Sequence, residues 1–217
     1  MPSFYKKLLK NFEHLSRSLH AVPRIPSEED REILKRLEKL RVNDPFNSSY
    51  NIEARSPLIC GATPERIVVE VREHQKMHFL TYWYFWSYDR FPSDHEDWEP
   101  VTLVYKEDKL ARVDARIHDA LISYTPQIDN TRPKVHFYRI GHTPIIKVKD
   151  IDHDILLNRL NDNLDYTRKK WLELCYQRAE SDGWKVCDPP KLESRKGPML
   201  DEIFWGKWGK HSIYLRV

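Results

Sequence analysis

Cysteine and glycine are both scarce in this chain of 217 residues, which contains three cysteines and six glycines. The odd, small number of cysteines argues against a disulfide-stapled scaffold and fits a reducing compartment. Whether Cys175 and Cys187 form a bridge stays open, because the sequence alone does not decide it. The sequence therefore predicts a fold that depends mainly on a hydrophobic core.

Long apolar runs and a strong charge of one sign are lacking too. No apolar run approaches the ~20 residues that a membrane-spanning helix needs, and residues 1–19 contain no apolar stretch of signal-peptide length. We therefore expect a soluble, cytoplasmic protein. The net charge of +3 does not mark a nucleic-acid binder, so nucleic acid is not an expected partner. The oligomeric state is left open.

What the chain does have is enough apolar material for one domain, with 40% hydrophobic and 12% aromatic residues. We predict the α+β class, with an antiparallel β-sheet or sandwich core, two N-terminal helices and one long helix near 152–181. The expected parts of this single domain 1–217 are a helical segment (1–42), a β core (66–148), the long helix (152–181) and a loop with a final strand (184–217).

The β core is predicted from short runs rich in β-branched and aromatic residues. The run at 77–89, MHFLTYWYFWSYD, is apolar on both faces around Tyr82–Trp86, so we expect it to be a central strand. Residues 43–64 contain mainly turn signals and are predicted to be a long connection. In the long helix, the predicted buried face is made by Leu156, Leu160, Leu164, Trp171 and Leu174, and Gly183 is the predicted end.

The stretch DHEDWE, residues 94–99, carries four carboxylates and one histidine around a single tryptophan. In a strand, alternate side chains share a face, so Asp97 and Glu99 point one way and Trp98 points the other way, into the predicted core. The structural alternative is an ordinary polar face with cross-strand ion pairs. Because so many carboxylates repel one another, a divalent cation among them is the sharper hypothesis.

A register argument extends this hypothesis to the next strand. If Lys106 pairs with Lys109 across a hairpin turn, Glu99 faces Arg116 and Asp97 faces His118. A slip of one residue would mix the two faces. Carboxylates alone suit Mg²⁺ or Ca²⁺, whereas an added imidazole from His118 or His95 shifts the preference toward Zn²⁺ or Mn²⁺.

The run from Tyr82 to His118 resembles the core of the necrosis- and ethylene-inducing-like proteins. These have an aromatic strand ending in Asp, a Gly-His-Arg-His-Asp-Trp-Glu heptad, then a strand and a later His. The run is also similar to a vacuolar-sorting-associated family with an Asp-Trp-Glu motif. The resemblance covers residues 79–118, and RIGHTP at 139–144 is a candidate extension.

The resemblance implies a β-sandwich with a divalent-cation site. Asp97 and Glu99 match the motif acids, and Asp89 matches the Asp that ends the aromatic strand. Asp94 and His95 fall where the heptad has its first His and its Arg. Ser93 replaces the heptad Gly, and neither toxicity nor a membrane target is carried over.

His142, in RIGHTP, follows a strand and a glycine and could approach the same site, although a solvated loop histidine is the plain alternative.

Three functional hypotheses stay open. The first is a divalent-cation-dependent module that binds a small polar ligand such as a glycan or a phosphorylated group. The second is a metal-dependent hydrolase that uses a metal-bound water. The third is a metal-free structural or interaction protein. The candidate residues are Asp89, Asp94, His95, Asp97 and Glu99 for the metal, His118 and Glu99 for catalysis, and Arg116, His142 and Trp86 for the ligand.

Overall fold

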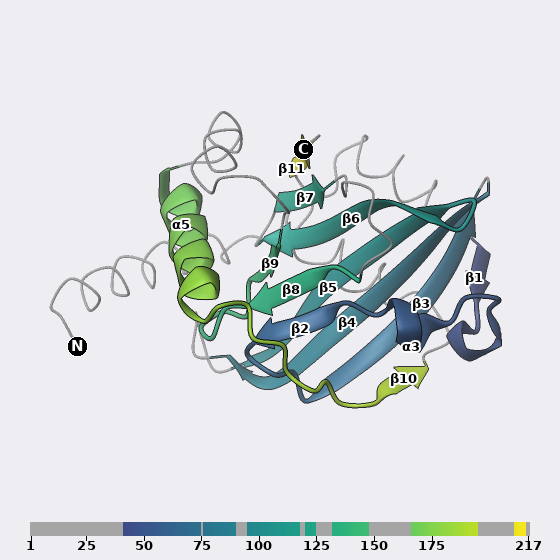
Figure 1. Ribbon diagram of the computed structural model, residues 1–217, viewed down its shortest axis with the longest axis horizontal. Helices are drawn as coiled ribbons and strands as arrows, with labels where there is room; N and C mark the ends of the chain where they lie inside the picture. Colours follow the sequence, from purple (N-terminus) through teal and green to yellow (C-terminus); the bar gives the residue numbers. More distant parts are fainter. Residues whose placement is uncertain are drawn as a thin grey trace, which may run out of the picture.

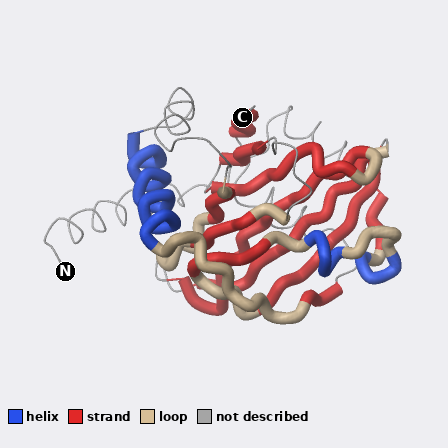
Figure 2. The backbone as a smooth tube through the Cα atoms, viewed as in Figure 1, coloured by secondary structure: helices blue, strands red, loops and turns tan. Residues whose placement is uncertain are grey.

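The computed structural model describes residues 41–74, 76–89, 95–117, 120–124, 132–147, 166–194 and 211–215. The two helices predicted within 1–42 lie on residues before Arg41 and so outside the described residues. The predicted end of the helical segment at residue 42 is wrong, because Arg41–Asn43 form a strand. Strands make up most of the described chain, as Figure 2 shows.

An eight-stranded sheet forms the larger layer, with the order β1-β3-β4-β5-β6-β7-β11 and with β10 also paired to β3. Neighbours from β1 to β7 are antiparallel, whereas β10 and β11 join in parallel. The strands are β1 (Arg41–Asn43), β3 (Arg66–His74), β4 (Met77–Asp89), β5 (His95–Lys106), β6 (Lys109–Ile117), β7 (Ala120–Tyr124), β10 (Leu192–Ser194) and β11 (His211–Leu215).

A three-stranded sheet of β2 (Leu58–Gly61), β8 (Lys134–Phe137) and β9 (Pro144–Ile146) lies over one face of the larger sheet (Figure 1). The main core fills the space between them. Its contacts include the Tyr84 and Trp86 rings, whose centroids lie 4.6 Å and 5.0 Å from that of Phe137. The predicted α+β class with a sandwich-like core is confirmed.

The described helices are few: η1 (Pro45–Asn47), α3 (Ile52–Arg55) and α5 (Tyr166–Ser181). The predicted helix near 152–181 is present from residue 166, and the part from 152 to 165 lies outside the described residues. Gly183 follows it with φ 64°, the left-handed conformation that ends helices. Leu174 is only half-buried, since the buried face of α5 consists of Trp171, Leu172, Cys175, Tyr176 and Ala179. None of the described helices has the length and apolarity to span a membrane.

Strand β4 is central, as its two apolar faces predict. It pairs with β3 on one side and β5 on the other, and its residues from Leu80 to Trp86 are all buried. The prediction that 43–64 is only a connection is wrong, because β2 lies within it. This short strand pairs in parallel with β8, far along the chain, and local turn signals hide such a pairing.

The hairpin between β5 and β6 has the predicted turn but not the predicted register. Lys106 pairs with Lys109, and a bulge between Val104 and Tyr105 then shifts the pairing by one residue, so that Thr102 faces Asp114. The described pairing runs as far as Val101 and Ala115, one residue away from the register that would place Glu99 opposite Arg116. The predicted pairing of Glu99 with Arg116 is therefore wrong, and His118 lies outside the described residues.

The faces of β5 are also the reverse of the prediction. Asp97 and Glu99 share the face of Val101 and Leu103, which belong to the main core under the smaller sheet. Trp98 points to the other side, where it is half-buried and packs on Phe85 with ring centroids 4.7 Å apart. The carboxylates consequently lie at the end of the main core.

All three cysteines are free thiols, so Cys175 and Cys187 form no bridge in this structure. Cys60 and Cys175 are buried, and burial raises the pKa of both thiols. Neither buried thiol has the lowered pKa of a reactive cysteine.

His136, in β8, is a buried imidazole that should make stability depend on pH. Burial lowers its pKa, although Asp182, whose Oδ2 lies 3.3 Å from the His136 Nε2, opposes this. The unfolded chain therefore takes up a proton here as pH falls through about 6.5 while the folded chain resists it, and stability falls.

We expect the free energy of unfolding, measured in urea, to fall between about pH 7.5 and pH 5.5, and the His136→Gln variant to fall less. An equal fall in the variant would show that this imidazole does not contribute.

Candidate metal centre

Two adjacent strands bring two aspartates to one end of the main core. Asp89 ends β4, and Asp97 lies near the start of β5, where its backbone pairs with Trp86. The pairing shifts between Trp86 and Asp89, a local irregularity that changes the direction of the strand end. The Asp89 side chain is buried and that of Asp97 is 22% exposed.

The turn between β8 and β9 supplies the third side chain. Tyr138 N–H donates to the Thr143 carbonyl oxygen across it (3.1 Å), and Gly141 and His142 have φ values of 70° and 33°. Gly141 N–H donates to Asp89 Oδ1 (2.9 Å), which ties the turn to the end of β4. A positive φ is costly for histidine, so its contacts must hold it there.

His142 is held from two directions. Its Nδ1 lies 2.9 Å from Asp97 Oδ2, and its ring stacks on the Trp86 ring with centroids 4.1 Å apart and planes 3° apart. Trp86 is fixed in turn, because its Nε1–H donates to the Thr63 carbonyl oxygen (3.0 Å). The result is a buried imidazole aimed at a carboxylate.

Asp89, Asp97 and His142 together form the candidate metal centre. Each offers one ligand atom, and these atoms lie within 4.8 Å of one another. Oxygen and imidazole nitrogen are both common donors to divalent cations. The three residues come from three separate segments that the fold brings to one point.

Helix α5 supports the turn from outside the centre. Trp171 Nε1–H donates to Thr143 Oγ1 (2.9 Å), and the Thr143 hydroxyl donates to the Gly141 carbonyl oxygen (3.3 Å). The Trp171 ring also meets the Tyr138 ring edge-on, with centroids 5.1 Å apart. These contacts fix the backbone that carries His142, and sequence reasoning missed them because no local pattern links Trp171 to the turn.

A further carboxylate lies at the rim. Glu65 Oε1 accepts hydrogen bonds from Ser87 N–H (3.0 Å) and from the Ser87 hydroxyl (2.6 Å). These bonds lower the pKa of Glu65, and the nearby His142 acts in the same direction. Glu65 is exposed, so it adds negative charge at the surface beside the centre.

The other predicted site residues are placed less closely or lie outside the description. Glu99 shares the face of Asp97, with its backbone paired to Tyr84, but it is not part of the three-residue group. The backbones of His95 and Arg116 pair with Asp89 and Leu121, and their side chains are not described. Asp94 and His118 lie outside the described residues, so a catalytic role for His118 stays a prediction.

Comparison with known proteins finds a distant structural likeness. No protein-family profile and no curated protein matches the chain. Among solved structures it resembles NLPPya, in a complex with glucosamine, with 11% identity, a TM-score of 0.42, and coverage of 78% of this chain and 96% of that one. It also resembles Necrosis and Ethylene inducing Protein 2 from the causal agent of cocoa's Witches Broom disease (15% identity, TM-score 0.38, coverage 52% and 74%). The expected resemblance to the necrosis- and ethylene-inducing-like proteins is thus found as a likeness of fold.

Proposed function

We propose that this protein binds a divalent cation at Asp89, Asp97 and His142, and that the cation recognises a small polar ligand such as a sugar or a phosphorylated group. The observation that supports the proposal is the convergence of two carboxylates and one imidazole within 4.8 Å. Two largely buried carboxylates repel each other, and a cation between them would offset that repulsion.

The donor set bears on which ion would bind. Carboxylates alone favour Mg²⁺ or Ca²⁺, but the His142 nitrogen shifts the preference toward Mn²⁺ or Zn²⁺. The ring nitrogen of His142 that binds a metal must be deprotonated, and binding through Nδ1 would exchange its contact with Asp97 Oδ2 for the ion. Three protein donors leave coordination positions for water or for oxygens of a ligand, as in open rather than closed sites.

Cation-dependent thermal stabilisation tests the proposal. With a cation about 100-fold above its Kd, we expect the melting temperature to rise by roughly 5–10 °C. In Asp97→Asn the rise should be lost, whereas Asp108→Asn, at an exposed carboxylate in the β5–β6 turn, should keep it. The rise for each variant is measured against its own cation-free sample. If Mg²⁺, Ca²⁺, Mn²⁺ and Zn²⁺ all leave the wild type unchanged, the proposal fails.

Trp171→Phe should weaken cation binding without removing a ligand. The variant keeps an aromatic ring but loses the hydrogen bond to Thr143, so the turn that carries His142 is less well fixed. Loss of such supporting contacts costs about 10–100-fold in metal affinity, and we expect the lower end, measured by calorimetric titration.

Trp184→Phe is the matched control. Trp184 follows the end of α5, and the variant loses an indole hydrogen bond to Glu180 within that helix. Equal affinities for Trp171→Phe and Trp184→Phe would show that the Trp171 contact does not position His142.

A further inference from the structure

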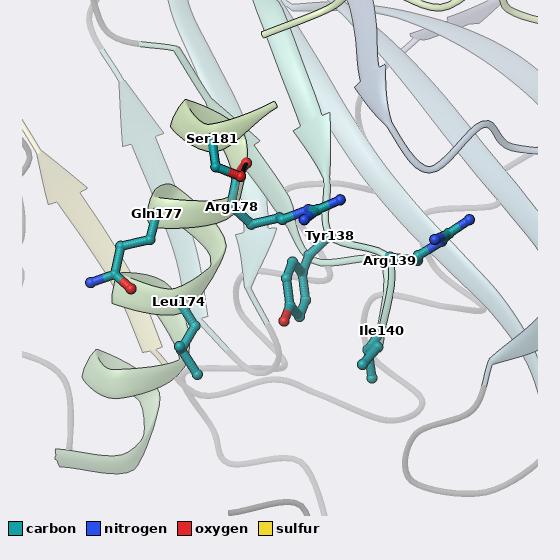
Figure 3. A pocket seen from close by; sticks show the side chains of 7 residues that line it. All are labelled: Tyr138, Arg139, Ile140, Leu174, Gln177, Arg178 and Ser181. Atoms are coloured by element: carbon teal, nitrogen blue, oxygen red, sulfur yellow. Dashed lines mark hydrogen bonds between the residues drawn. The ribbon is translucent and has the colours of Figure 1, made fainter. Parts of the chain in front are cut away.

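A groove of about 410 Å³ lies on the surface between α5 and the segment that follows β8. Tyr138, Arg139 and Ile140 form one side, and Leu174, Arg178 and Ser181 are on the helix side (Figure 3). The groove is distinct from the metal centre. Trp171 lies between the two sites. Its ring contacts Tyr138, which lines the groove, and it also lies close to Gly141, whose N–H donates a hydrogen bond to Asp89.

The charged groups of the groove are all cations. Arg139 is exposed, and Arg178 extends from α5 toward the segment that carries Tyr138 (Figure 3). Arg178 Nε lies 3.1 Å from Asp182 Oδ2, which holds the guanidinium by one edge. No carboxylate side chain lines the groove among the described residues. Two guanidinium groups on one groove favour an anion.

The rest of the lining suits an apolar body attached to that anion. The Tyr138 ring, Ile140 and Leu174 provide an aromatic and aliphatic surface, and the Tyr138 ring is oriented by its edge-on contact with Trp171. The Gln177 amide and the Ser181 hydroxyl add neutral hydrogen-bonding groups. Small-molecule sites commonly combine such a surface with a few polar groups.

We infer that this groove is a second binding site, for a small organic anion in which a phosphate or carboxylate is attached to an aromatic or aliphatic body. Arg139 and Arg178 bind the acidic group, and Tyr138 and Leu174 contact the body. Binding here does not need the cation of the proposed metal centre.

Calorimetric titration of the full chain with phenyl phosphate tests the inference, with EDTA present throughout. We expect saturable binding of one molecule per chain with a Kd of about 1 mM or tighter. Benzoate in place of phenyl phosphate tells a carboxylate ligand from a phosphate ligand, and binding of either supports the site. Phenol, which lacks the charge, and inorganic phosphate, which lacks the ring, should each bind more weakly.

Arg139→Gln and Arg178→Gln should each weaken binding by about tenfold or more. Lys106→Gln, which removes one exposed positive charge in the β5–β6 hairpin, should leave it unchanged. Absence of saturable binding by both anions, or equal weakening by Lys106→Gln, would overturn the inference. Binding that appears only when EDTA is replaced by a cation would assign the anion to the metal centre instead.

Discussion

Arg72→Met is expected to lower the free energy of unfolding by about 3–5 kcal/mol, because it removes the guanidinium group that is paired with a buried carboxylate. Arg72 and Glu70 are alternate residues of β3, and their side chains are 2% and 1% exposed. The Arg72 Nε and Nη2 groups donate to Glu70 Oε1 (3.1 and 2.9 Å), and Trp83 Nε1–H donates to Glu70 Oε2 (3.3 Å). The measurement is denaturant unfolding at neutral pH.

The double variant Glu70→Gln/Arg72→Met separates loss of the charge pair from loss of packing. It removes both charges, so it should recover much of the stability that Arg72→Met loses. If the loss of stability in the double variant equals the sum of the losses in Glu70→Gln and Arg72→Met, the two side chains act independently and the expectation is wrong.

Gly61→Ala is expected to have an effect of similar size. Gly61 ends β2 with φ 78°, and an added Cβ would contact the Phe137 carbonyl oxygen and lie 2.8 Å from the His136 ring. A left-handed backbone costs a non-glycine residue about 1–2 kcal/mol, and overpacking costs roughly 1–3 kcal/mol more. The smaller sheet would have to move apart, so a loss of about 2–5 kcal/mol in the free energy of unfolding follows.

Gly183→Ala is the matched control, since Gly183 has φ 64° with no atom within 4 Å of the added Cβ. It should show only the backbone cost of about 1–2 kcal/mol. Equal losses in the two variants would mean that the close contact between β2 and β8 is relieved at no cost.

The features that sequence predicts well here are those set by neighbours along the chain. The apolar run around Tyr82–Trp86 correctly predicts a central strand, and the pairing of Lys106 with Lys109 correctly predicts the hairpin turn. The alternation of side chains does not predict the bulge after Val104, because the extra residue is accommodated by backbone geometry rather than by a distinctive side chain. One bulge is enough to change which residues face each other beyond it.

The candidate site was only partly predictable for a related reason. Asp89 and Asp97 lie on adjacent strands, so a local motif indicates both. The sequence indicates His142 only as a residue that could approach the site. It does so, but it comes from a turn in the other sheet, and its contact with Asp97 depends on how the two sheets pack. Glu70 and Arg72 show the same limit, since alternation of apolar and polar residues in β3 is typical of an exposed face, yet both are buried.

Pulsed electron paramagnetic resonance of Mn²⁺ added to the purified protein tests the metal centre most directly, because it detects nitrogen bound to the ion. We predict one tightly bound Mn²⁺ per chain with coupling to an imidazole nitrogen, displaced by Zn²⁺. His142→Gln should remove the nitrogen coupling, and Asp97→Asn should weaken binding. Absence of bound Mn²⁺ and Zn²⁺, or a nitrogen coupling that persists in His142→Gln, would contradict a cation site at Asp89, Asp97 and His142.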